Sequence, residues 1–239
     1  MEKSNGYLTN FENIISNNID KDDLSNFYRN IKTLVFKIKA FNPNVSFWTT
    51  VTGNYDSKKN KINVYEASDD IIYHELLHMA SSFYQKGIWR EGFFLRDSNV
   101  KSLGVGLNEG YTELLARRLF NIDSKVCNGY EYQVYIVRLL ERIIGKDYMQ
   151  RYYFNANLPG LIDDLSQYNS QEDIIKFLHN TDYILNVLDK AAVFRKNQVC
   201  SKLTKINEFL SKTYMKKNVF RISIRHNIQK KYVNKNCSF

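Results

Sequence analysis

Glycine and proline are scarce in this chain. It has 10 glycines and 2 prolines among 239 residues, and these residue types supply most tight turns. So few turn-forming residues cannot separate the many short strands of a β-sandwich or barrel. A hydrophobic content of 44% and a charged content of 25% are typical of a globular protein. The sequence therefore predicts a mainly α fold with a small β-sheet, which is an α+β arrangement.

Hydrophobic periodicity places the expected elements along the chain. The N-terminal part is expected to hold a helix over residues 23–39 and two strands over 45–51 and 61–66, with a hairpin loop at 53–60. A helix over about 69–84 follows, and a glycine-punctuated connection at 87–106 leads to a helix over 108–121. The remaining segments with helical spacing are 130–144, 147–155, 160–168, 171–188 and 198–217, and residues 220–225 alternate like a strand. These elements predict a small N-terminal sheet followed by a helical C-terminal part.

Cationic side chains are concentrated near the C-terminal end of the sequence. Residues 190–239 hold 13 lysines and arginines against one acid, Glu208, so their net charge is +12, whereas residues 1–189 carry −3. We expect 1–189 to form the main domain and 190–239 to form a basic, helical segment that is part of it or appended to it. Three interpretations stay open for this segment: a solvated face that favours solubility, docking onto the acidic residues of 1–189, or a site for an anionic partner.

The cysteines and the N-terminal sequence indicate the cellular compartment. Cys127, Cys200 and Cys237 are odd in number, far apart and without CxxC spacing, which argues against a disulfide framework and a cysteine zinc site. The N-terminus lacks the pattern of a signal peptide, and no run approaches 18 apolar residues. We therefore expect a cytoplasmic protein with no integral membrane segment.

Residues 74–78 read HELLH, an HExxH motif. On the expected helix over 69–84, His74 and His78 lie four residues apart, so their imidazoles project from one face near enough to share an ion, with Glu75 beside them. Chance alone would produce on the order of 0.003 such matches in a chain of this composition. Two core histidines bonded to backbone carbonyls are the structural alternative, but burying two imidazoles without a ligand is costly. The motif predicts a metal site.

A catalytic zinc ion needs a third protein ligand and keeps a fourth position for water. The acids that follow the motif are Glu91, Asp97, Glu109 and Glu113. Residues 107–113 read LNEGYTE and place Glu109 and Glu113 four apart on one face of a helix. The alternative for Glu109 is a solvated acid that the helix dipole stabilises.

On HELLH at 74–78 and LNEGYTE at 107–113, the chain resembles zinc metallopeptidases of the gluzincin type, which include thermolysin-like and aminopeptidase-like catalytic domains. The resemblance implies a zincin-like fold with the HExxH helix between the small N-terminal sheet and the helical C-terminal part. It also implies Zn²⁺ held by His74, His78 and Glu109, with Glu113 accepting a hydrogen bond from a ligand histidine, His74. The interval at 79–108 is longer than in those families, and the Gly-x-Met-Glu-Asn exopeptidase signature is absent.

The resemblance further implies a zinc-dependent hydrolase that cleaves peptide bonds of a peptide or protein substrate. Glu75 would act as the general base for zinc-activated water. The substrate is expected along an edge strand at residues 61–66, immediately before the metal helix. A tyrosine or histidine beyond the second glutamate helix would stabilise the oxyanion. The candidates are Tyr130, Tyr132 and Tyr135, with core packing as the alternative for each.

Two other functions stay open. One is a catalytically inactive zincin-fold binding module whose basic C-terminal segment engages an anionic partner. A purely structural zinc site has no need of a glutamate beside its ligand, so Glu75 favours the enzyme. The other is a different HExxH hydrolase, such as a deformylase, but the cysteine ligand expected upstream of the helix in that class is absent here.

Overall fold

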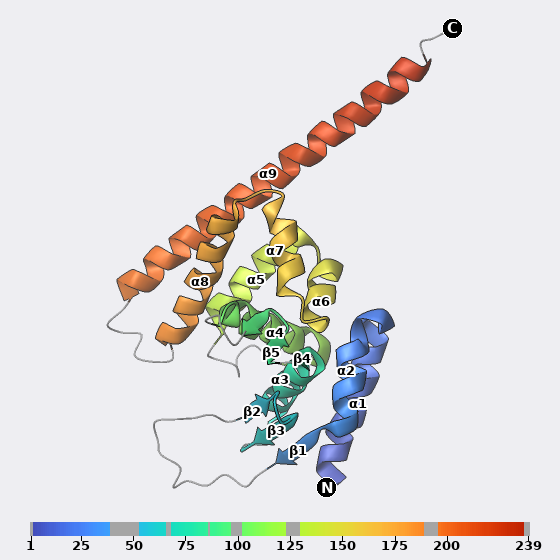
Figure 1. Ribbon diagram of the computed structural model, residues 1–239, viewed down its shortest axis with the longest axis vertical. Coiled ribbons are helices and arrows are strands. Elements are labelled where there is room, and N and C mark those ends of the chain that lie inside the picture. The colour runs from blue at the N-terminus through green and yellow to red at the C-terminus, as the bar shows by residue number, and fades with distance from the viewer. Residues whose placement is uncertain are drawn as a thin grey trace.

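The protein is mainly helical and carries two small sheets, as the scarcity of glycine and proline predicts (Figure 1). The structure is a computed structural model, and it describes residues 2–38, 53–65, 68–85, 87–96, 102–122, 130–188 and 196–236. Each sheet has three strands, in the orders β1-β3-β2 and β4-β5-β6. The second sheet lies in the segment that the sequence indicated as a connection.

The N-terminal region differs from the helix expected over 23–39. It begins with α1 (Glu2–Asn18), the 3₁₀ turn η1 (Lys21–Leu24), α2 (Ser25–Asn30) and the 3₁₀ turn η2 (Ile31–Thr33), and it ends in strand β1 (Val35–Ile38). The prediction is wrong beyond Asn30 because β1 pairs in parallel with β3 (Lys61–Val64). Backbone pairing with a distant segment has overridden the local helical period.

The first sheet places β3 at its centre. Strand β2 (Gly53–Asp56) pairs with β3 in an antiparallel register, so half of the hairpin loop expected over 53–60 is a strand. The expected strand over 45–51 lies outside the described residues. The expectation that 61–66 forms an edge strand is wrong, because β3 has neighbours on both sides. Strand β2 occupies the edge, and among the described residues it pairs only with β3.

The HExxH helix is α3 (Asp69–Ala80), which begins where the sequence predicts. Asp69 and Asp70 lie in its first turn, where their negative charges interact favourably with the positive end of the helix dipole. It ends at Ala80, before the expected residue 84, because the chain enters β4 (Ser82–Gln85). β4 pairs with β5 (Ile88–Glu91), and β5 pairs with β6 (Phe94–Arg96), both antiparallel. This hairpin returns the chain to the C-terminal end of α3, where the backbone N–H of Gly92 donates to the Ser81 carbonyl.

The helices after residue 100 agree closely with the predicted ranges. They are α4 (Val105–Phe120), α5 (Glu131–Ile144), α6 (Lys146–Phe154), α7 (Leu158–Ser166) and α8 (Gln171–Leu188). Among the described helices, none contains a segment long and apolar enough to cross a bilayer.

Within the basic C-terminal segment, residues 196–236 form one continuous helix, α9 (Lys196–Asn236), of 41 residues. The strand-like alternation at 220–225 lies within it, so that expectation is wrong. The first half of α9 packs on α5 and α8 and buries Val199, Ile206, Phe209 and Leu210. At about 1.5 Å per residue the helix is roughly 60 Å long, and Figure 1 shows its C-terminal part extending beyond the other helices.

Candidate metal centre

Helix α3 presents His74 and His78 on one buried face, as the spacing predicts. Their Nε2 atoms lie 3.0 Å apart. Glu109 on α4 completes the group, because its Oε2 atom lies 3.2 Å from Nε2 of His74 and 3.6 Å from Nε2 of His78. One potential ligand atom from each of the three residues lies within 4.8 Å of the other two. The structure therefore brings HELLH and LNEGYTE together.

Helix α4 is held in this position at its N-terminal end by Asp182 of α8. The carboxylate of Asp182 accepts hydrogen bonds from the backbone N–H groups of Gly104 and Gly106, at 2.9 and 2.8 Å. These N–H groups belong to the start of a helix, where backbone donors lack intrahelical partners. Gly110 lets α5 approach, since a Cβ atom there would lie 2.6 Å from the backbone of Gln133. The close packing of α5 therefore explains why the residue after Glu109 is a glycine.

Each histidine also faces a carboxylate with its second ring nitrogen. Nδ1 of His74 lies 3.3 Å from Oε2 of Glu113, as the sequence predicted for this pair. Nδ1 of His78 lies 2.8 Å from Oε1 of Glu91, at the end of β5. The sequence had indicated Glu91 only as a possible ligand. Its contact with His78 was missed because it depends on the β4–β5 pairing, which the local pattern did not reveal.

Asn108, the residue before Glu109, holds Glu91 in place. Its Nδ2 group donates to Oε1 of Glu91 at 3.1 Å, and its Oδ1 atom accepts the backbone N–H of Phe93 at 3.1 Å. Asn108 is itself buried. The asparagine therefore joins the start of α4 to the turn after β5, and it fixes the carboxylate that faces His78.

His74, His78 and Glu109 could hold a metal ion. If the Nε2 atoms bind a metal ion, the ring proton of each histidine lies on Nδ1, where the carboxylate of Glu113 or Glu91 can accept it. Carboxylates that hold ligand histidines in this way are usual around protein-bound zinc. Two imidazole nitrogens and one carboxylate oxygen match a catalytic zinc site, which keeps one position open.

Without a metal ion, the neighbouring carboxylates favour the protonated form of His74 and His78. Burial lowers the pKa of His74, but hydrogen bonds to Glu109 and Glu113 outweigh burial and raise that pKa to about 9. Burial also opposes the charged form of His78, whereas Glu109 and Glu91 raise its pKa well above the usual value. The pKa of Glu109 is lowered, because the histidines outweigh its own burial. A cation that binds here must therefore displace protons.

Glu75 lies beside the metal group and borders the same cavity. This cavity has a volume of about 420 Å³ and is lined by His74, Glu75, His78 and Glu109 together with residues of β2. Glu75 is 9% exposed, and burial raises the pKa of its carboxyl group. β2 approaches it closely, since a Cβ atom at Gly53 would lie 3.2 Å from Cγ of Glu75.

Of the three tyrosines that the sequence indicated, Tyr130 reaches this cavity. Its ring stacks on His74 with centroids 5.5 Å apart and an interplanar angle of 12°, and it lines the cavity. Tyr132 and Tyr135 lie on α5, are 43% and 48% exposed, and do not line the cavity. The structure therefore does not bring these two to the site.

Part of the remaining cavity wall is apolar. The apolar side chains come from β5, the start of β6, the start of α4 and the end of α8, and they are Trp89, Phe94, Val105 and Leu185. No lysine or arginine is among the described residues that line it. Its charged groups are the carboxyl groups of Glu75, Glu91 and Glu109, with the two histidines.

Comparisons with known proteins add no relative. No protein-family model matches the chain, and no curated protein or solved structure is significantly similar to it. The resemblance to gluzincin-type enzymes therefore rests on the two sequence motifs.

Proposed function

We propose that this protein is a zinc-dependent hydrolase, specifically a metallopeptidase that cleaves peptide bonds. The observation that carries this proposal is the convergence of His74, His78 and Glu109 at one end of a cavity that Glu75 also lines. A purely structural zinc site would be closed by four protein ligands. Here three donors face an open cavity, which supports a site that admits substrate.

Zinc, when bound, supplies an acidified water molecule and a Lewis acid for the substrate carbonyl. Glu75 is the general base of the proposed reaction. Because burial raises its pKa, its carboxylate can take a proton from water and return it to the leaving amine. Glu91 and Glu113 keep the two imidazoles in one tautomer and orientation. Tyr130 is the remaining candidate for contact with the oxyanion, because it borders the cavity.

The peptide substrate is proposed to lie along β2. Gly53, Asn54 and Tyr55 of this edge strand line the cavity, and the main chain of an edge strand can pair with an extended peptide. The apolar wall formed by Trp89, Phe94, Val105 and Leu185 suits an apolar substrate side chain.

The metal content of purified protein tests the first half of the proposal. About one zinc per chain is expected in the native protein, and His78→Ala should lose it because two donors remain. His179→Ala is the matched control, since His179 is exposed on α8 and far along the chain from the group. Stoichiometric zinc in His78→Ala would refute the site.

The activity of Glu75→Gln tests the second half. This variant keeps all three ligands, so zinc and fold should be retained, while hydrolysis of a quenched peptide library should fall to background. Retained turnover would remove Glu75 from the mechanism. Full zinc occupancy with no turnover in the native protein would instead favour the inactive binding module, whose basic C-terminal segment engages an anionic partner.

A further inference from the structure

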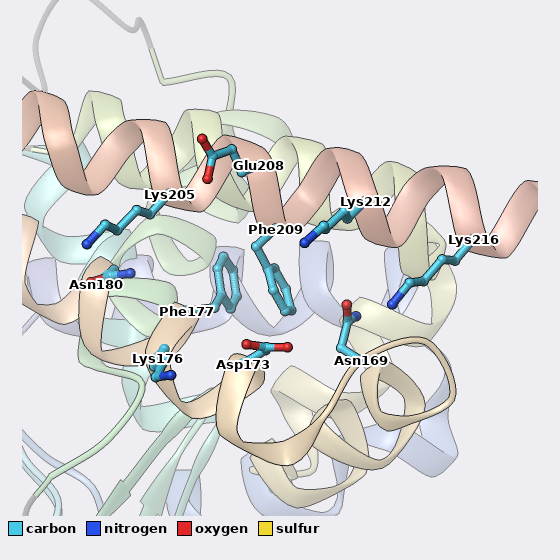
Figure 2. Close-up of a pocket in the computed structure, with 10 residues that line it drawn as sticks. All are labelled: Asn169, Asp173, Lys176, Phe177, Asn180, Lys205, Glu208, Phe209, Lys212 and Lys216. Atoms are coloured by element: carbon cyan, nitrogen blue, oxygen red, sulfur yellow. The ribbon is translucent and has the colours of Figure 1, made fainter.

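A second cavity lies between α8 and the first half of α9, away from the candidate metal centre (Figure 2). Its volume is about 380 Å³, within the range of small-molecule sites. The stacked rings of Phe177 and Phe209 lie in its middle, with centroids 4.6 Å apart and an interplanar angle of 14°. Both rings are buried, so they join the two helices and give the cavity an apolar centre.

Two of the four lysines that line this cavity have no polar partner among the described residues. Lys176 pairs with Glu172 at 2.6 Å, and Lys216 donates to the Tyr168 carbonyl at 2.6 Å. Lys205 and Lys212, by contrast, make no ion pair or hydrogen bond with any residue that the structure describes. They lie seven residues apart on α9, which separates their backbone positions by about 10 Å along the helix axis.

Asn180 supplies an uncharged donor at one end of the cavity. It is 9% exposed, and its amide group forms no hydrogen bond with the described part of the chain. Figure 2 shows Lys205 reaching from α9 toward Asn180, on the other side of the phenylalanine pair from Lys212. The two ends of the cavity thus each offer a donor.

The acids that line the cavity do not neutralise these lysines. Asp173 accepts a hydrogen bond from Ser170 Oγ at 2.8 Å, at the start of α8. Glu208 is exposed on α9. Neither carboxylate lies within ion-pair distance of Lys205 or Lys212 in the described structure. The lining therefore has a net positive charge, with four lysines against two acids.

We propose that this cavity binds an elongated small molecule with an anionic group at each end and an apolar middle. Asn180 and Lys205 hold one anionic group, Lys212 holds the other, and the apolar portion lies against Phe177 and Phe209. Carboxylates and phosphates both meet this requirement. The inference is independent of the proposed hydrolase activity, because it uses none of the residues of the metal centre.

Calorimetric titration of the full chain with sebacate, a ten-carbon dicarboxylate, and with decanoate, which has one carboxylate, tests the proposal. Sebacate is expected to bind saturably and about 10-fold more tightly than decanoate, because decanoate leaves one end of the site without a charged hydrogen bond. Lys212→Gln should reduce the sebacate affinity to that of decanoate. Equal affinities of the native protein for the two probes, or no binding of either, would overturn the proposal.

Variants at the Asn180 end of the cavity distinguish specific contacts with the ligand from general electrostatic attraction. Asn180→Ala and Lys205→Gln should each weaken sebacate by about 10-fold. Lys202→Gln is the matched control, because it makes the same charge change on the same helix, while Lys202 lies over the Tyr183 ring and outside the cavity. If Lys202→Gln weakens sebacate as much as Lys205→Gln does, the binding is non-specific and the site is refuted. Lys205 is exposed, so its variant keeps the test valid if Asn180→Ala fails to fold.

Discussion

Oε1 of Glu91 lies 2.8 Å from Nδ1 of His78, which joins the end of strand β5 to the HExxH helix. The equivalent nitrogen of His74 faces Glu113 of α4. Two histidines one helical turn apart are therefore held by carboxylates from two different elements. The Nδ1 atoms of both rings make these contacts, and the Nε2 atoms face one another and Glu109.

Replacing Glu91 should weaken metal binding without abolishing it. Glu91→Ala leaves all three proposed ligands but removes the acceptor that orients His78, so zinc affinity should fall by about 10- to 100-fold. Competition with a coloured chelator measures this change. Glu172→Ala, an exposed glutamate paired with Lys176 on α8, should leave the affinity unchanged. An unchanged affinity in Glu91→Ala would show that the contact does not support the site.

Glu109 and Glu113 should differ in their effect on the metal. Glu113→Ala should weaken zinc by about 10- to 100-fold, because Glu113 faces the outer nitrogen of His74. Glu109→Ala should empty the site, because it removes a ligand. Zinc analysis of both variants after dialysis distinguishes them. An empty Glu113→Ala protein beside a loaded Glu109→Ala protein would mean that the two roles are exchanged.

Gly53→Ala should disturb Glu75 more than it disturbs the metal. The added Cβ atom would lie 2.5 Å from Cγ2 of Ile71 and 3.2 Å from Cγ of Glu75, so one of these side chains must move. We expect a lower kcat with retained zinc and a loss of stability of about 1–3 kcal/mol, as overpacking typically costs. Gly6→Ala is the control, since a Cβ atom there meets nothing within 4 Å. Native kcat in Gly53→Ala would show that β2 does not position the base.

The metal-free protein should lose stability as the pH rises above neutrality. A histidine with a raised pKa stabilises the folded state below its ordinary pKa of 6.5, and this contribution disappears as the pH passes the folded value, which is about 9 for His74. The free energy of unfolding, measured by urea denaturation with a chelator present, should therefore fall between these values by on the order of 1–3 kcal/mol. His74→Gln should flatten the fall, and an equal fall in that variant would assign it to other groups.

Truncation should separate the two halves of α9. Removal of residues 196–239 exposes the apolar surface that Val199, Ile206, Phe209 and Leu210 cover, so it should destabilise the fold by several kcal/mol, at roughly 1.5–3 kcal/mol per buried side chain. Removal of residues 220–239 should leave the unfolding temperature and zinc content nearly unchanged. A stable protein that ends at residue 195 would show that α9 contributes little to the core.

Local patterns in the sequence were sufficient for most of helices α3 to α8 and for the shared face of His74 and His78, but not for α1. Four acids stayed open as the third proposed ligand until the resemblance indicated Glu109. The two histidines share a face by helical geometry alone, and the acidic motif lies on a helix of its own. Glu113 was assigned to His74 by resemblance, and the structure places it there. In these cases the residues that matter lie a few positions apart in a single helix or a single motif.

The elements that the sequence did not reveal depend on contacts between distant segments. Residues 35–38 fit a helical period as well as a strand, and their pairing with β3 decides the outcome. Glu91 reaches His78 only because β4 and β5 form a hairpin after α3. Residues 220–225 alternate like a strand, yet they continue a helix whose first half is fixed by packing on α5 and α8.

The contacts of His74 and His78 also tie metal affinity to the folding equilibrium. The proposed metal donors and the carboxylates that hold the histidines come from α3, the end of β5 and α4, and these segments meet only when the tertiary structure is complete. A cation that binds this arrangement binds the native chain far more tightly than the unfolded chain, so mass action shifts the population toward the native state. Metal supply would then influence how long each copy of the protein resists proteolysis.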